Sequence, residues 1–342
     1  MKVHTDMLRT RASANSIGAG PKPVDGGRPV VRWTVGILFL VAVAACFCKP
    51  MINLAHHAVD SQLDSYVVLI PFIVAYLIHT RWKELPRHYT VSPISAVIAL
   101  GIGTCAASFA RYGDHRGISS HDYLSLMAFS CVCWILAGGF LFLGRNWMLA
   151  ALFPVAFLFF AAPLPDRLVD RLETASRLAS CDAASVFFML SGTPVLRDAN
   201  VFSLPGMTIQ VAQECSGIHS SLVLFITSLI AANLMLQTSW RRLFLVAFVI
   251  PLGILRNGFR ILVIGLLCVH VSPDMINSPI HHKGGPLFFV LSLIPFFLVL
   301  WWLRKGEASC AGPRPTTGAG SVLTLPVSSD SGQASPQSQI HV

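Results

Sequence analysis

Charged residues are scarce in this chain. Lysine, arginine, aspartate and glutamate make up 12% of its 342 residues, whereas 54% are hydrophobic. Soluble domains contain about 25% charged residues, so the composition excludes a water-soluble globular protein. The formal net charge of +9 does not predict a nucleic-acid partner, because the basic excess of a membrane protein normally lies in cytoplasmic loops against anionic lipid.

The signatures of common metal, nucleotide and serine chemistry are also missing. No C-x-x-C pair occurs among the nine cysteines, and no G-x-S-x-G, H-E-x-x-H or P-loop pattern is present. Most cysteines lie inside apolar runs, where this residue is usually small and buried. The histidines expected outside the membrane are too far apart in sequence to form a distinctive ligand pattern: His56, His57, His115 and His121. We therefore expect neither a metal nor a cofactor.

Long apolar runs dominate what is present. A helix that crosses the roughly 30 Å hydrocarbon layer needs about 20 residues. We predict eight transmembrane helices, of which the second and fifth are short and are expected to kink at Pro71 and Pro154. The predicted spans are 32–51, 63–80, 91–110, 123–143, 147–164, 217–236, 243–270 and 286–303. The fold class is an all-α polytopic membrane protein.

Polar sequence flanks this membrane domain, which we place at 31–305. Residues 1–30 are basic and rich in glycine and proline, and 306–342 form a low-complexity tail, so both are predicted to be disordered. The connections that would lie on the same side as the N-terminus carry most of the lysines and arginines, whereas acids prevail in the others. This asymmetry predicts an inner-membrane protein with both termini in the cytoplasm.

The one long connection, 165–216, is expected outside the cytoplasm. Its first half, "DRLVDRLETASRLASCDAASVFFML", spaces apolar residues three and four apart, which predicts an amphipathic helix along the membrane surface. The rest predicts short extended pieces, with turns at 192–194 and 205–206. This segment leads directly to Glu214 and Cys215, where the sixth span begins.

Two further groups of polar residues are expected at the same depth as Cys215. Arg256 and Arg260 lie inside the seventh apolar run, four residues apart and therefore on one helix face, with Asn257 beside them. Intramembrane arginines normally face the protein interior or a wet cavity. The connection to the eighth helix supplies the second group, which is His281 and His282 with the permissive glycines Gly284 and Gly285.

Thiol, guanidinium and imidazole together predict nucleophilic catalysis. Arg260 would favour the thiolate of Cys215 and stabilise an oxyanion, and His281 would accept the proton and return it to the leaving amine. Arg256 is an alternative to Arg260 or shares its role, and His282 is an alternative to His281. Glu214 is expected to orient His281 or to pair with an arginine. The plainer interpretation is that Cys215 is a buried apolar residue, the histidines are solvated, and the arginines bind carbonyls or acids that hold the helices together.

Three motifs give this sequence a resemblance to a known family. "ECSGI" around Cys215, "RNGFRI" with Arg260, and "HHKGG" from His281 to Gly285 resemble the exosortase/archaeosortase family of membrane transpeptidases, and the resemblance covers roughly 190–305. It implies a cysteine enzyme that cleaves carboxy-terminal sorting signals of exported proteins, of the PEP-CTERM kind, and passes the protein to an acceptor. Such a signal consists of a short motif, a membrane helix and a basic cluster. The catalytic residues implied are Cys215, Arg260 and His281.

Two alternatives come from other classes of protein. A polytopic transporter would use the arginines and histidines for an anion pathway, but it predicts paired repeats that the sequence does not show. A non-catalytic component of exopolysaccharide export would need none of Cys215, Arg260 and His281. Exported proteins with the sorting signal, together with membrane lipid, are the partners expected of the enzyme.

Overall fold

The computed structural model describes residues 29–60, 64–86, 90–205, 207–212, 217–271 and 285–310. Within them, six helices are long and apolar enough to cross a membrane: α2 (Pro29–Asp60), α4 (Pro93–Asp114), α5 with the π-helical η2 (Ser120–Leu143), α9 (Ile218–Met235), α10 (Ser239–His270) and α12 (Gly285–Cys310). The chain is therefore a multi-pass membrane protein. Of the tails predicted to be disordered, 1–30 and 306–342, residues 1–28 and 311–342 lie outside the described residues, whereas 29–30 belong to α2 and 306–310 to α12.

The predicted count of eight spans is not confirmed, and the difference lies in the second and fifth. The second is a 3-10 turn, η1 (Val67–Leu69), followed by α3 (Ile70–Thr80), and Pro71 lies in the first turn of α3, where a proline does not kink the helix. The fifth is broken into α6 (Arg145–Ala150), α7 (Leu152–Phe157) and η3 (Leu158–Ala161). If the pieces after Leu152 and the next helix are counted as one bent span, the described residues contain up to seven.

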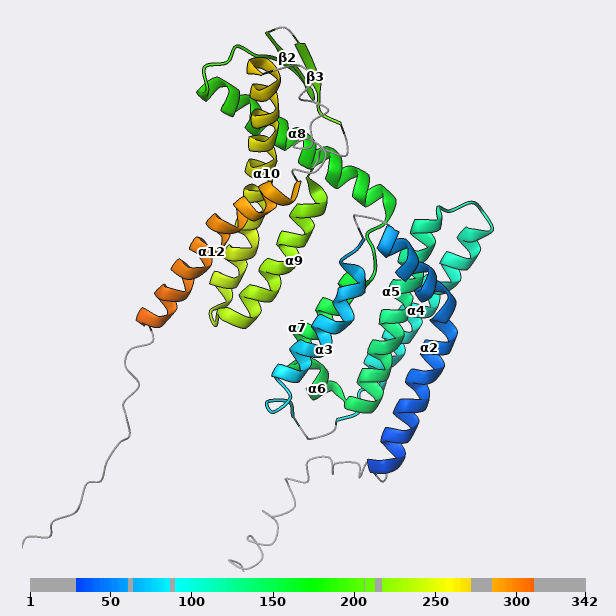
Figure 1. Ribbon diagram of the computed structural model, residues 1–342. Helices are drawn as coiled ribbons and strands as arrows, with labels where there is room; N and C mark the ends of the chain where they lie inside the picture. Colours follow the sequence, from blue (N-terminus) through cyan, green and yellow to red (C-terminus); the bar gives the residue numbers. More distant parts are fainter. Residues whose placement is uncertain are drawn as a thin grey trace, which may run out of the picture.

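The amphipathic helix predicted in the long connection is confirmed as α8 (Asp166–Leu190). It bends by 95° from the preceding helical segment, and it crosses one end of the neighbouring helices (Figure 1). The extended pieces that follow it form an antiparallel sheet, β1 (Leu196–Asp198), β2 (Val201–Leu204) and β3 (Met207–Gln210), in the order β1-β2-β3. We call the end of the molecule formed by α8 and this sheet the α8 end.

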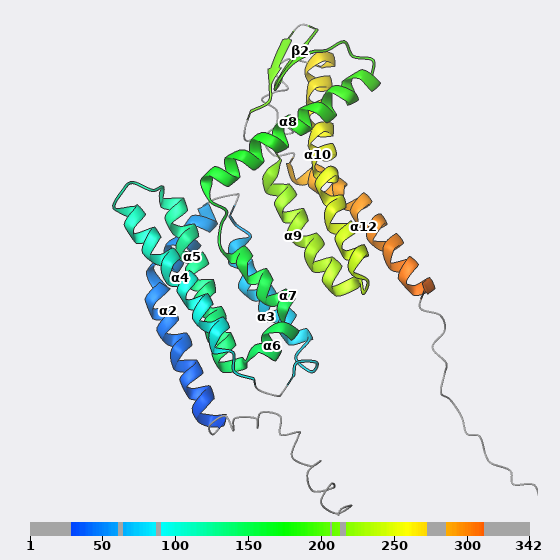
Figure 2. The ribbon, with the colours of Figure 1, turned by 180° about the vertical axis from the view of Figure 1, so that it is seen from behind.

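The helices form two groups. Seen from both sides, α2 to α7 lie together, α9, α10 and α12 lie together, and α8 runs from the first group to the second (Figures 1 and 2). The start of α2 and the end of α12 lie at the end opposite α8, on the same side of the molecule. This arrangement agrees with the expectation that both termini lie on one side of the membrane.

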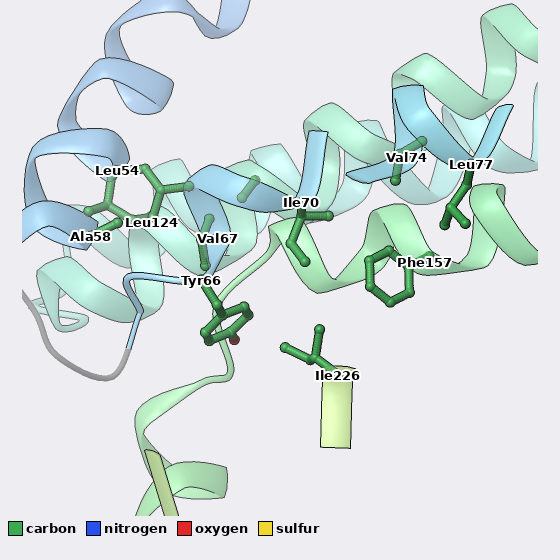
Figure 3. Packing of buried hydrophobic residues seen from close by; sticks show 11 residues of the cluster. Leu54, Ala58, Tyr66, Val67, Ile70, Val74, Leu77, Leu124, Phe157 and Ile226 are labelled. Atoms are coloured by element: carbon green, nitrogen blue, oxygen red, sulfur yellow. The ribbon is translucent and has the colours of Figure 1, made fainter. Parts of the chain in front are cut away.

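An apolar cluster packs the first group together and joins it to α9. Figure 3 shows Leu54 and Ala58 of α2 beside Val67 and Leu124, and Ile226 of α9 close to Phe157 of α7. At the opposite end from α8, Arg81 donates a hydrogen bond to Asn233 at 3.0 Å, which gives the two groups a polar contact as well.

The α8 end is built around the last turns of α10, which extend beyond α9. Phe188 of α8, Phe202 and Ile209 of the sheet, and Ile264 of α10 belong to one buried cluster. Arg197 of β1 ties the sheet to α8, because its Nη1 lies 2.6 Å from Oδ1 of Asp182. The sheet is therefore a fixed platform from which the chain returns to the start of α9.

Candidate functional site

The polar turn of α10 lies against the first turn of α9. Nη2 of Arg256 donates to the carbonyl oxygen of Gly217 at 3.1 Å and to Oγ of Ser221 at 3.0 Å. The Arg256 residue is only 8% exposed, and no carboxylate of the described residues lies within ion-pairing distance of it. Arg256 therefore stabilises the start of α9, as the plainer interpretation of the arginines expects.

Gly217 precedes α9 and has the backbone conformation that glycine alone adopts readily. Its φ is +68°, and a Cβ there would lie 2.9 Å from Oδ1 of Asn257 and 3.0 Å from Cγ. Asn257 is 3% exposed. A side chain at Gly217 would therefore meet both backbone strain and the amide of Asn257.

Two other close approaches hold α10 in place. A Cβ at Gly258 would lie 2.8 Å from Cβ of Ala183 on α8, and one at Gly253 would lie 2.7 Å from Oγ of Ser221 on α9. Glycine at these two positions allows α8 and α9 to contact the same turn of α10 from two sides. The polar residues between them are fixed by backbone packing.

The start of α12 reaches the same turn. Phe288, 6% exposed and in the first turn of α12, packs edge-to-face on Phe259 with ring centroids 6.3 Å apart. Both views show α9 and α12 beginning beside the middle of α10 (Figures 1 and 2). The chain that follows Cys215 and the chain that follows His281 therefore both meet α10 between Arg256 and Arg260.

Four of the predicted site residues lie within the described part of the chain. Arg256 and Asn257 are buried, Arg260 is half-buried one helical turn further toward the α8 end, and Gly285 begins α12. Glu214, Cys215, His281 and His282 lie outside the described residues. The predicted convergence of sulfur, guanidinium and imidazole therefore stays a prediction.

Three residues of this region are not among the predicted site residues. Ser221 contacts Arg256, and Gly217 provides the left-handed turn before α9. The serine lies one helical turn after the glycine in "GIHSS", but its partner 35 residues later depends on how α9 packs against α10. The third is His219, which is half-buried in the first turn of α9.

The cysteine of α8 that lies near this turn is a poor nucleophile. Cys181 of α8 is fully buried, and burial raises the pKa of its thiol, which the nearby Arg197 and Arg177 only partly offset. A cavity of about 1000 Å³ lies elsewhere, toward the end opposite α8, with mostly apolar lining and Arg32 and Lys83 among its residues. Arg260, the one predicted catalytic residue that the structure describes, is not among the residues that line it.

We expect Gly217→Ala to lower the thermal stability of the protein in detergent more than a matched substitution does. The left-handed backbone alone costs an alanine roughly 1–2 kcal/mol, and the contact with Asn257 adds to this. Gly192→Ala is the control, because its φ is +72° but nothing lies within 4 Å of its added Cβ. In an Asn257→Ala background the two glycine substitutions should cost the same. If Gly217→Ala and Gly192→Ala lowered the stability equally with Asn257 present, the close contact between Gly217 and Asn257 would be contradicted.

A family comparison agrees with this architecture. The family model described as transmembrane exosortase (Exosortase_EpsH) matches residues 58–324, which is most of the chain. The match extends well beyond the motifs in 190–305 and includes α3 to α7 of the first group of helices, but only the last residues of α2. The chain therefore belongs to the transmembrane exosortase family. Comparison with curated proteins and with solved structures finds no match.

Proposed function

We propose that this protein is a membrane cysteine transpeptidase that cleaves carboxy-terminal sorting signals of exported proteins. Its reaction would take place at the α8 end, on the extracytoplasmic side of the inner membrane. The observation that carries the proposal is the meeting of α9 and α12 at the turn of α10 from Arg256 to Arg260. Cys215 precedes Gly217 by two residues, and His281 precedes Gly285 by four.

Covalent geometry supports this assignment. An extended chain spans at most about 3.6 Å per residue, so the Cα of Cys215 is within about 7 Å of that of Gly217. The carbonyl of Gly217 is in turn hydrogen-bonded to Arg256. An anion just before α9 would be favoured by three sources of positive charge. They are the guanidinium of Arg256, that of Arg260 and the positive end of the α9 helix dipole. A thiolate at Cys215 is such an anion.

The two arginines would have different roles. The guanidinium of Arg256 is engaged by the carbonyl of Gly217 and the hydroxyl of Ser221, so we assign it to positioning the start of α9. Arg260 is more exposed and lies on the same helix face, one turn closer to the α8 end. We therefore assign to Arg260 the contact with the thiolate and with the oxyanion.

The chemistry would proceed through an acyl-enzyme. Sulfur of Cys215 attacks the scissile carbonyl, Arg260 stabilises the oxyanion, and His281 protonates the leaving amine as the C–N bond breaks. An acceptor nucleophile then attacks the thioester, gives its proton to His281 and regenerates the thiol. Asn257 would hold the Gly217 turn, and Gly285 would let the histidine segment approach.

A processing assay tests this function. The chain is co-expressed with an exported reporter that carries a short motif, a membrane helix and a basic cluster at its carboxy terminus, taken from the same genome. The proposal expects a shortened reporter by mass spectrometry only when the wild-type chain is present. Unprocessed reporters, together with solute uptake into vesicles that thiol alkylation does not change, would favour the transporter instead.

The same assay separates the candidate histidines. We expect His281→Ala to lower the rate of processing by about 10²–10⁴, the usual contribution of a general acid–base group, and His282→Ala to have a much smaller effect. His270→Ala is the matched control, because His270 is an exposed histidine that ends α10, and among the described residues its hydrogen bond is to a backbone carbonyl of its own helix, that of Leu266, at 3.0 Å from Nδ1. If His282→Ala lowered the rate of processing more than His281→Ala, the acid–base role would belong to His282.

A further inference from the structure

A second group of polar side chains meets at the α8 end of the first helix group. It comprises His57 in the last turns of α2, Asp64 just before η1, His121 in the first turn of α5, and Asp166, the first residue of α8. We call these residues the His–Asp cluster. These residues come from four separate parts of the chain, and none of them lies in the turn of α10 described above.

Three of these residues bring potential metal-ligand atoms close together. Oδ2 of Asp64 lies 3.0 Å from Nε2 of His121 and 3.7 Å from Nε2 of His57. One ligand atom from each residue lies within 4.8 Å of the others. The longer distance exceeds that of a hydrogen bond, so hydrogen bonding does not account for the approach of His57.

These spacings fit a shared metal ion. Zinc binds imidazole nitrogen and carboxylate oxygen at about 2.0–2.2 Å, and a tetrahedral angle then separates two ligand atoms by about 3.3–3.5 Å. The two distances from Asp64, 3.0 Å and 3.7 Å, bracket this value. Asp64 is 3% exposed, and a carboxylate buried to this degree needs cationic or hydrogen-bonding partners.

The far side of His121 is arranged as metal-binding histidines usually are. Its other ring nitrogen, Nδ1, lies 2.6 Å from Oδ1 of Asp166. Asp166 is itself held in place, because Oγ of Ser119 donates to its Oδ2 and its backbone N–H donates to Oδ1 of Asp122 at 2.8 Å. In the tautomer that carries its proton on Nδ1, next to Asp166, Nε2 presents a lone pair toward Asp64, which is the form in which a histidine binds a metal ion. A metal ion placed there would bind both this nitrogen and the carboxylate oxygen of Asp64.

We propose that His57, Asp64 and His121 bind a divalent transition-metal ion of the zinc class, with Asp166 as the residue that orients His121. The ion connects the end of α2 to the starts of η1 and α5, and through Asp166 it fixes the start of α8. The apolar cluster of Figure 3 lies directly beside it, with Ala58 next to His57 in sequence and Leu124 one turn after His121. Three protein ligands leave a fourth position for water.

This proposal replaces the sequence-based expectation that the chain has no metal site. That expectation rested on the separation of the histidines along the sequence, and the structure brings two of the four, His57 and His121, within 5.4 Å between ring centroids. His56 and His115 are exposed and belong to neither of the two metal-compatible groups of the described residues.

Zinc binding to the full-length protein in detergent tests the proposal. Protein stripped with a chelator is titrated with ZnCl₂, and bound zinc is measured by mass spectrometry of the metal after desalting, together with the thermal unfolding temperature. We expect one zinc per chain and a higher unfolding temperature with zinc. His57→Gln should lose both effects, and Asp166→Asn should weaken zinc binding about 10–100-fold.

The control is His56→Gln, one residue away on α2 and outside the cluster. The His57 side chain is 43% exposed, so its substitution leaves the core intact even if variants of the buried Asp64 fail to fold. Zinc that binds the His57→Gln and His56→Gln proteins equally would overturn the proposal. Wild-type protein that takes up no zinc would do so as well, and the cation of the cluster would then be a proton on His121.

Discussion

Replacing Cys215 with alanine should abolish processing of the reporter while the protein stays at its normal level in the membrane. The acyl-enzyme needs a nucleophile at this position, and water cannot replace the sulfur within the same geometry. The expected loss is at least about 10³-fold, and Cys215→Ser should restore little of it because a hydroxyl is far less acidic than a thiol. Product formation is followed by mass spectrometry, and protein level by quantitative immunoblot.

Cys181→Ala is the control for this result. Cys181 is a buried cysteine on α8, which crosses α10 at Gly258, and alanine fills almost the same space. We expect processing in this variant to match that of the wild-type protein. Full processing by Cys215→Ala, or loss of processing only in Cys181→Ala, would contradict the assignment of the nucleophile.

We expect substitutions of Arg260 to affect the rate of processing, and substitutions of Arg256 to affect the stability of the protein. Arg260→Gln should lower processing by about 10²–10³, which is the effect of removing a donor to an oxyanion. Arg260→Lys should retain part of the activity, because it keeps the charge but not the planar fork of donors. Neither substitution should change the thermal unfolding temperature much, since Arg260 is half-buried.

Arg256→Lys provides the comparison. It alters the hydrogen bonds to Gly217 and Ser221, and a hydrogen bond to a charged group is typically worth about 1.5–3 kcal/mol. We therefore expect a lower unfolding temperature, with a loss of activity that follows the loss of folded protein. If Arg256→Lys instead lowered the rate in fully folded protein while Arg260→Gln did not, the two roles would be exchanged.

Local patterns in the sequence predict the elements of this fold well, because each depends on few neighbours. The apolar spacing of 166–190 predicts α8, and the turn residues around Gly192 and Pro205 predict the extended segment that forms the sheet. The second and fifth spans differ from the prediction for a physical reason. Their apolar runs are interrupted into pieces shorter than a membrane crossing, which hydrophobicity alone does not reveal.

The sequence motifs predict which residues belong to the site, but not which residues they contact. The four-residue spacing of Arg256 and Arg260 places both on one face, but the partner of Arg256 is a backbone carbonyl on another helix, which no side-chain pattern encodes. The contact between Gly217 and Asn257 depends in the same way on helix packing. The His–Asp cluster is the clearest case, since its ligands are separated by most of the first helix group and meet only in three dimensions.

The central claim is that the segments carrying Cys215 and His281 converge on the α10 turn that contains Arg260. An experimental structure of the protein in lipid measures this directly, through the distances from Sγ of Cys215 to Cζ of Arg260 and to the nearer ring nitrogen of His281. The proposed mechanism predicts that both distances are about 4–6 Å, the range in which an opposite charge favours ionisation. Both distances beyond about 10 Å, where exposed charges are largely screened, would contradict it.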